Sequence, residues 1–295
     1  MAITAALVKE LRERTGAGMM ECKKALVETA GDLEAAIESM RKSGQAKAAK
    51  KAGRTAADGV VVIAVAEDAG IGVLVEVNCE TDFVAKDAGF IAFADKVAAR
   101  VLTSGAVDIE TLEAAPLEED GNTPIAQARE SLVAKLGENI RLRRLTRLDD
   151  VKGGLYSYRH GVRIGVLVEL EDGNAALGKD IAMHIAATNP ICVSADQVPA
   201  ATLEKEKEIF RAQALESGKP EKILPKIVEG RVRKYLEEVT LLGQSFVKDS
   251  DRTVQELLAQ AGARVVRFTR FEVGEGIEKK QENFADEVMA QVLGN

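Results

Sequence analysis

The amino-acid sequence predicts an α+β protein in which a small helical unit precedes two related halves, each made of strands and helices. Three observations predict this class. Helical periodicity opens the chain, a hexapeptide with strand character occurs twice, and a helical stretch follows each copy. Short hairpins rather than long crossovers join the strands, which favours α+β over a parallel α/β fold.

Residues 1–42 are expected to form a three-helix domain. Glycines on both sides of Ala17 break the first helix from the second, and Asp32 is expected to cap the third. Three stripes of apolar residues at helical spacing predict the helices: Ile3, Leu7 and Leu11; Met19, Cys22 and Leu26; Leu33, Ala36, Ile37 and Met40.

Residues 43–57 are predicted to be a basic linker. The stretch from Arg41 to Ala57 carries six bases, no acid and no large apolar residue. Two interpretations are open: a solvated connector, partly helical, or a patch that docks on an acidic partner surface or on RNA. We adopt the linker as the prediction.

Beyond the linker the sequence repeats itself. Ile71–Glu76 recurs letter for letter as Ile164–Glu169, and Arg141–Leu148 is similar to Arg264–Phe271. The first pair lies 93 residues apart and the second 123, so the second half holds about thirty additional residues. The predicted parts are a core N-subdomain at 58–150 and a core C-subdomain at 151–197 and 241–272.

The additional residues are predicted to form an inserted antiparallel helical hairpin at 198–240. Two charge-rich helical stretches, Leu203–Leu215 and Leu224–Val239, flank a turn signal at 217–220. The second stretch carries a near-heptad apolar stripe, which is typical of coiled-coil packing.

Composition limits the classes of function. The chain of 295 residues is 46% hydrophobic and 29% charged, and no apolar run is long enough to span a membrane. The start lacks the features of a signal peptide, and the three cysteines lie far apart, so we expect a cytoplasmic protein. A net charge of −7 and 4% aromatic residues argue against direct nucleic-acid binding.

Signatures of catalysis are absent from the sequence. It has no GxxxxGK[ST] loop, and its two histidines, His160 and His184, fit no metal-ligand spacing. No cysteine or serine lies in a nucleophile elbow. We therefore predict no enzymatic activity, no catalytic residue, no metal site and no cofactor.

Three places are candidate contacts with a partner. In the second helix, Met20 with Met19 at the edge either packs under neighbouring segments or offers apolar contact to another protein. Thr81 or Asp82 either caps a helix, with Phe83 stapling it, or forms a contact segment. The second half lacks this segment, so the shared fold does not require it, and this favours the interpretation as a contact segment. His160, in the expected turn between two strands, is a surface residue or a contact.

Several long motifs in order resemble bacterial elongation factor Ts across essentially the whole chain. They are Leu11–Met20 with Cys22–Leu26, Thr81–Val84, His160-Gly161 before Ile164–Val168, and Arg270–Glu278. The resemblance implies a ubiquitin-associated-like (UBA-like) N-terminal domain, two related subdomains, a coiled-coil hairpin and a C-terminal module at 273–295.

The resemblance also implies a function: guanine nucleotide exchange on elongation factor Tu, in its GDP-bound and nucleotide-free forms. It implies that the residues contacting this partner are Arg12, Met19, Met20, Lys23 and His160. Thr81, Asp82, Phe83 and Val84 would disturb the Mg²⁺ and phosphate site. The alternative is an RNA- or ribosome-binding protein without exchange activity, which would use the bases of Lys47–Arg54 and Arg141–Arg147.

Overall fold

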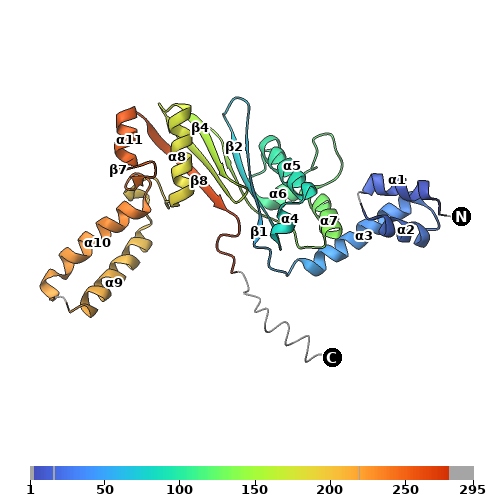
Figure 1. Ribbon diagram of the computed structural model, residues 1–295, viewed down its shortest axis with the longest axis horizontal. Coiled ribbons are helices and arrows are strands. Elements are labelled where there is room, and N and C mark those ends of the chain that lie inside the picture. The colour runs from blue at the N-terminus through green and yellow to red at the C-terminus, as the bar shows by residue number, and fades with distance from the viewer. Residues whose placement is uncertain (1–2, 16, 219, 279–295) are drawn as a thin grey trace. The chain divides into compact units, whose positions relative to one another are not determined.

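The computed structural model describes residues 3–15, 17–218 and 220–278 and confirms a mixed fold with small antiparallel sheets (Figure 1). The described residues divide into two compact units: one holds those within 3–62, 75–145 and 272–278, the other those within 63–74 and 146–271. The helices are α1 Ala5–Thr15, α2 Met19–Glu28, α3 Leu33–Lys51, α4 Asp82–Ala85, α5 Ala88–Ser104, α6 Ile109–Ala114, α7 Ile125–Leu136, α8 Ala175–Thr188, α9 Ala200–Glu216, α10 Leu224–Val239 and α11 Val254–Ala261. The strands are β1 Asp58–Val65, β2 Gly72–Cys79, β3 Arg141–Leu148, β4 Gly154–His160, β5 Ile164–Glu171, β6 Ser245–Phe246, β7 Asp249–Thr253 and β8 Arg264–Glu272.

Helices α1 to α3 form the predicted three-helix unit around one small core. The side chain of Asp32 accepts a hydrogen bond of 3.0 Å from the amide of Ala35, so it caps α3 as expected. The buried residues of this core are Val8, Leu11, Cys22, Ala25, Leu26 and Ala36.

The third helix continues past residue 42, where the three-helix domain is predicted to end, because α3 extends to Lys51. Alanine and lysine favour the helix, and the extension packs on α7. Gly44 is buried in this contact, and a Cβ added there would fit in ordinary van der Waals contact, 3.9 Å from the Cβ of Ala134. Lys51 donates to the carbonyl of Gly137. Most of the expected linker is therefore a packed helix.

The two halves repeat one buried ion pair. The first sheet has the order β1-β2-β3 and the second β4-β5-β8. Glu76 on β2 accepts a hydrogen bond of 2.6 Å from Nε of Arg144 on β3. At the matching positions, Glu169 on β5 accepts one of 2.7 Å from Nε of Arg267 on β8. Both carboxylates are buried. The sequence repeat is thus also a structural repeat, down to its charged core residues.

Hydrogen bonds keep the buried Glu76 ionised. Burial alone would raise the pKa of this carboxyl, but the amide of Gly274, at 2.8 Å, and the guanidinium of Arg143, at 2.9 Å, lower the pKa below its ordinary value. Arg144 also pairs with Glu275 at 3.0 Å. The segment that follows β8 is therefore fastened to the buried carboxylate of the first sheet.

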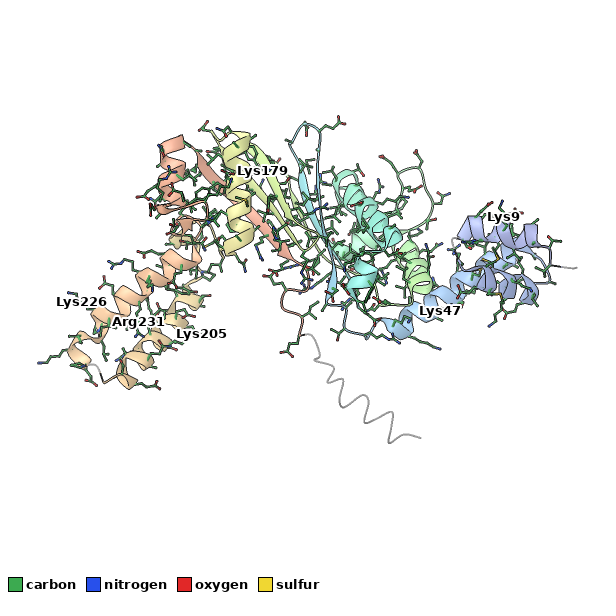
Figure 2. All side chains as sticks on the ribbon, in the orientation of Figure 1. Lys9, Lys47, Lys179, Lys205, Lys226 and Arg231 are labelled. Atoms are coloured by element: carbon green, nitrogen blue, oxygen red, sulfur yellow. The ribbon has the colours of Figure 1, made fainter. Side chains whose placement is uncertain are left out.

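The inserted residues form the predicted pair of consecutive helices, α9 and α10, which pack on each other (Figure 1). The rings of Phe210 and Tyr235 meet edge to face at 6.2 Å. Figure 2 labels Lys205 on α9 and Lys226 and Arg231 on α10; Arg231 donates to Gln213 across the pair at 2.9 Å. The coiled-coil and UBA-like descriptions, like the domain boundaries, stay predictions.

In the second unit, α8 packs on β4 and β5 and holds the only buried histidine of the described residues. Nδ1 of His184 accepts from the amide of Val247 at 3.2 Å, so the ring proton lies on Nε2, 3.0 Å from the Gln244 side-chain oxygen. Burial lowers the pKa of His184. The neutral imidazole thus ties β6 and the loop after it to α8.

No helix within the described residues has both the length and the apolar character that crossing a membrane requires. The predicted C-terminal module is described only as far as Glu278, so residues 279–295 of that prediction lie outside the described part of the chain.

Replacing Gly274 by alanine should destabilise the protein. Its φ is +75°, and an added Cβ would lie 2.2 Å from the carbonyl oxygen of Ala57. We expect Gly274→Ala to lower the free energy of unfolding in urea by about 2–3 kcal/mol. Gly276→Ala is the matched control, because its φ is +76° but its Cβ would meet nothing closer than 3.9 Å. Equal losses from both variants would show that the contact with Ala57 is unimportant.

Stability should also fall in mild acid because of His184. Its pKa is lower in the folded protein, so the unfolded chain binds a proton first as the pH falls through about 6.5. The free energy of unfolding should therefore decrease from about pH 7.5 downwards, before carboxylates titrate. Urea unfolding at a series of pH values measures this decrease. His184→Gln should remove it and His160→Gln should not; an unchanged profile in His184→Gln would contradict the assignment.

Candidate functional site

The segment after β2 presents a short exposed helix, and we call Asp82 and Phe83 the tip. Strand β2 is buried along its whole length, and the chain leaves it at Glu80 to enter α4. The hydroxyl of Thr81 accepts from the amide of Val84 at 3.4 Å and caps α4. A rigid strand therefore leads directly into the tip.

Side chains of α4 divide into an exposed pair and a buried pair. The ring of Phe83 is 80% exposed, whereas Val84 and Ala85 are buried. Asp82 forms an exposed ion pair of 2.6 Å with Lys86. An exposed ring does not staple a helix, so Phe83 lacks the packing role considered from sequence. Val84, by contrast, anchors the segment in the core.

A carboxylate from another loop holds the start of the tip segment. Glu138, between α7 and β3, accepts from the amides of Glu80 and Thr81, each at 3.0 Å, and from the Thr81 hydroxyl at 2.6 Å. The side chain of Glu80 in turn accepts from the amide of Asn139 at 2.6 Å. We call Glu80, Thr81, Glu138 and Asn139 the reciprocal clamp.

Sequence reasoning missed Glu138. A single glutamate in a loop has no distinctive sequence signal. The available signal was a difference in length between the two repeats: three residues separate Gly137 from the first residue of β3, but one separates Gly262 from the first residue of β8.

The cysteine at the end of β2 is unreactive. Burial and the nearby Glu138 carboxylate raise the pKa of the Cys79 thiol to about 12, and the thiol donates to the carbonyl of Thr81 at 3.1 Å. Across the described residues, no cluster of three or more histidine, cysteine, aspartate or glutamate side chains is arranged to hold a metal ion. The segment therefore presents the exposed ring of Phe83 and the charge of Asp82, while its neighbouring thiol is unreactive.

A second exposed apolar surface lies on α2. Met20 is 75% exposed, Met19 58% and Val27 60%, while Cys22 and Leu26 are fully buried. The predicted stripe is therefore wrong at Met19, the first residue of α2, which is exposed to solvent while Cys22, Ala25 and Leu26 of the same helix fill the small core. Arg12 on α1 and Lys23 on α2 are also exposed.

His160 is the last residue of β4 rather than a turn residue, and it pairs with Ile164 across Gly161. Its Nδ1 lies 3.2 Å from the hydroxyl of Tyr158, and its side chain is exposed. His160 belongs to the second unit, whereas the tip and the α2 surface belong to the first. The candidate residues thus come from both units.

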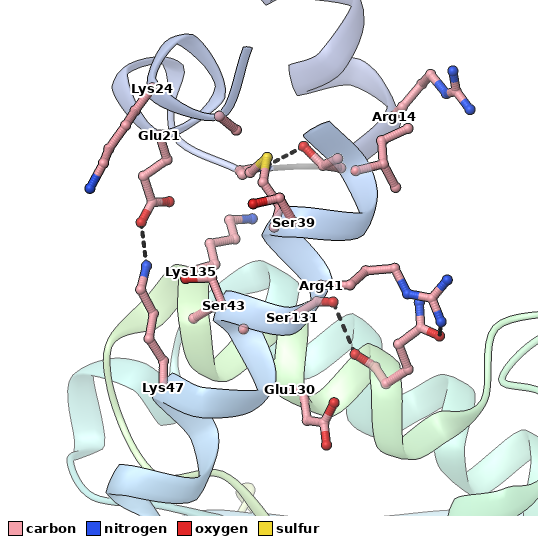
Figure 3. A pocket seen from close by; sticks show the side chains of 18 of the residues that line it. Arg14, Glu21, Lys24, Ser39, Arg41, Ser43, Lys47, Glu130, Ser131 and Lys135 are labelled. Atoms are coloured by element: carbon pink, nitrogen blue, oxygen red, sulfur yellow. Dashed lines mark hydrogen bonds and ion pairs between the residues drawn. The ribbon is translucent and has the colours of Figure 1, made fainter. Parts of the chain in front are cut away.

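A cavity of about 350 Å³ lies among α2, α3 and α7 (Figure 3). Two of the charged side chains in its lining have partners there: Lys47 bonds Glu21 at 2.6 Å, and Arg41 bonds Gln127 at 2.7 Å. We assign no ligand to this cavity.

Comparison with known proteins identifies the family. The family model described as elongation factor TS matches residues 80–275. The elongation factor Ts of Thioalkalivibrio sulfidiphilus is 61% identical over 295 residues, which is 100% of both chains. That of Methylococcus capsulatus is 61% identical over 292 residues, 99% of each chain, and that of Legionella pneumophila 56% over 290 residues, 98% of each. These matches define a translation elongation factor. The chain belongs to the elongation factor Ts family, so the resemblance read from the sequence is confirmed.

Truncating Phe83 should leave stability nearly unchanged, because its ring is already in solvent. We expect Phe83→Ala to change the free energy of unfolding by less than about 0.5 kcal/mol. Phe90→Ala, which removes a fully buried ring on α5, is the control and should cost about 3–5 kcal/mol. Urea denaturation measures both. A large loss in Phe83→Ala would mean that the ring packs in solution.

Proposed function

We propose that this protein is a guanine nucleotide exchange factor for elongation factor Tu. In this proposal the tip enters the nucleotide site of the partner and disturbs the support of Mg²⁺ and phosphate. The observation that carries the proposal is an 80% exposed aromatic ring held on a braced segment that only one of the two halves possesses. Family membership supports it. Such a protein needs no catalytic residue and acts in the cytoplasm.

The free-energy argument is one of linkage. A protein that weakens GDP binding by some factor must itself be weakened by GDP to the same extent, and each factor of ten corresponds to about 1.4 kcal/mol. Mg²⁺ neutralises phosphate charge, so disturbing its support removes much of the nucleotide affinity. The proposed exchange thus follows from binding alone, with no covalent step.

The other exposed residues have proposed roles in docking. Met19 and Met20 suit an adaptable apolar contact with the GTPase domain of the partner, flanked by the charges of Arg12 and Lys23. His160, in the second unit, would contact a different domain of the partner. Contacts at several separate places would hold the partner while the tip acts.

The RNA-binding alternative is less well supported, because several of the bases it needs already have partners within the protein. In the basic stretch, Lys47 pairs with Glu21 and Lys51 donates to Gly137. In β3, Arg143 and Arg144 bond Glu76. Phosphate contacts by these side chains would break existing ion pairs.

Release of fluorescent GDP from elongation factor Tu, followed by stopped flow, tests the proposal. The intact protein should accelerate release, and Phe83→Ala should reduce that acceleration by about tenfold for each 1.4 kcal/mol of lost coupling. Asp82→Ala should act on the same step and be non-additive with Phe83→Ala. Val107→Ala, which truncates another largely exposed apolar side chain, should have no effect.

Failure of the intact protein to accelerate release would refute the exchange function. If the intact protein binds the partner without changing the GDP release rate, it is a simple adaptor. If the intact protein binds RNA in a salt-sensitive way and does not bind elongation factor Tu, that result would favour the RNA-binding alternative.

A further inference from the structure

We propose that Glu138 is a positioning residue for exchange: it fixes the direction in which the tip projects, although it lies 55 residues away in sequence from Phe83. This inference rests on the proposed function. It assigns Glu138 no contact with the nucleotide or with Mg²⁺. Its role is to hold the segment that carries Phe83.

The contacts of Glu138 suit this role. One carboxylate receives two backbone amides and one hydroxyl from two consecutive residues, Glu80 and Thr81, at 2.6–3.0 Å. Hydrogen bonds to an ionised acceptor are the stronger kind, and bonds to the backbone define the path of the chain itself. These bonds lie immediately before the tip, so the direction of α4 depends on them.

The clamp is also braced from the opposite side. Asn139 donates its amide to Glu80, and its side chain donates to the carbonyl of Arg54 at 2.8 Å. Arg54 in turn lies 3.6 Å from the carboxylate of Glu80. Asn139 is 3% exposed, so this support is shielded from water. The end of β2, the loop before β3 and the chain after α3 are thereby joined at one point.

Comparison of the two halves separates this clamp from the shared fold. Both halves end the helix before their last strand with a left-handed glycine, Gly137 at φ +81° and Gly262 at φ +64°. After that glycine the first half has two more residues before its strand, and they include Glu138 and Asn139. Both halves keep the buried Glu–Arg ion pair. The fold therefore forms without the clamp, and the clamp occurs only where the tip occurs.

A tip that is already held in position lowers the entropic cost of binding the partner. Helix α4 has only four residues, too few to be stable by itself, and Phe83 makes no packing contact that would hold it. A loosely held tip would have to be ordered at each encounter, at a cost in conformational entropy. With the clamp in place, that order exists before the partner binds.

Glu138→Gln tests the inference. A neutral amide keeps one acceptor oxygen and loses the charge, so the hydrogen bonds from the two backbone amides weaken, and the Thr81 hydroxyl can no longer donate to the side chain where it faces the NH2 group. Amide hydrogen exchange should accelerate at Glu80 and Thr81, and stimulated GDP release should fall by about tenfold. The matched control is Glu113→Gln, which breaks the 2.7 Å ion pair with Arg129 in the same unit without touching the clamp; it should change neither quantity.

The decisive measurement is the double variant with Phe83→Ala. If Glu138 acts through the position of Phe83, Glu138→Gln should have little further effect once the ring is gone. A purely structural role predicts the same fold-reduction in both backgrounds, and that result would overturn the inference. So would a Glu138→Gln protein that releases GDP at the unmodified rate while Phe83→Ala is slowed.

Two further measurements complete the test. If Glu138→Gln does not fold, Thr81→Val removes the 2.6 Å hydroxyl contact with Glu138 together with the cap of α4, and it should give the same non-additivity with Phe83→Ala; additivity there overturns the inference. Absence of any acceleration by the intact protein is a separate result, because it refutes the proposed exchange function itself.

Discussion

The architecture depends on a carboxylate buried in each sheet and neutralised by an arginine of the neighbouring strand. A buried, unpaired charge would cost several kcal/mol, so Glu76 and Glu169 depend on the hydrogen bonds that they receive from Arg144 and Arg267 and from backbone amides. A slip of one residue in either strand would turn the arginine to the other face. The ion pairs therefore specify strand register, and the register determines where the end of β2 delivers the chain.

The repeated ion pair could not be recognised in the sequence, although the repeat itself could. Ile71–Glu76 and Ile164–Glu169 are identical, so two related halves were predictable from letters alone. Burial of the last residue of each motif was not, because a glutamate at the edge of an apolar run normally faces water. The matching arginines stood in two other segments, and only the folded sheets bring them beside the carboxylates.

Local sequence patterns did not predict the structure at positions where tertiary packing determines it. The stretch around Gly44 lacks large apolar residues, which favours a linker, yet it continues α3 and packs against α7. Met19 matched the apolar spacing of α2 but has no core to enter. The tip was predictable as a feature of one half only, while its support by Glu138 was not, because contacts over such sequence separations leave no periodic pattern.

The bond from Gly274 to Glu76 has a consequence for the order in which the protein can complete its fold on the ribosome. Its two partners are separated by 198 residues, which takes roughly 10–40 seconds to synthesise. During that interval Glu76 already has its arginines but lacks the last amide donor. The last of these donors thus belongs to nearly the last described residues to emerge, and a nascent chain carries its tip before the buried carboxylate behind that tip has received all its hydrogen bonds.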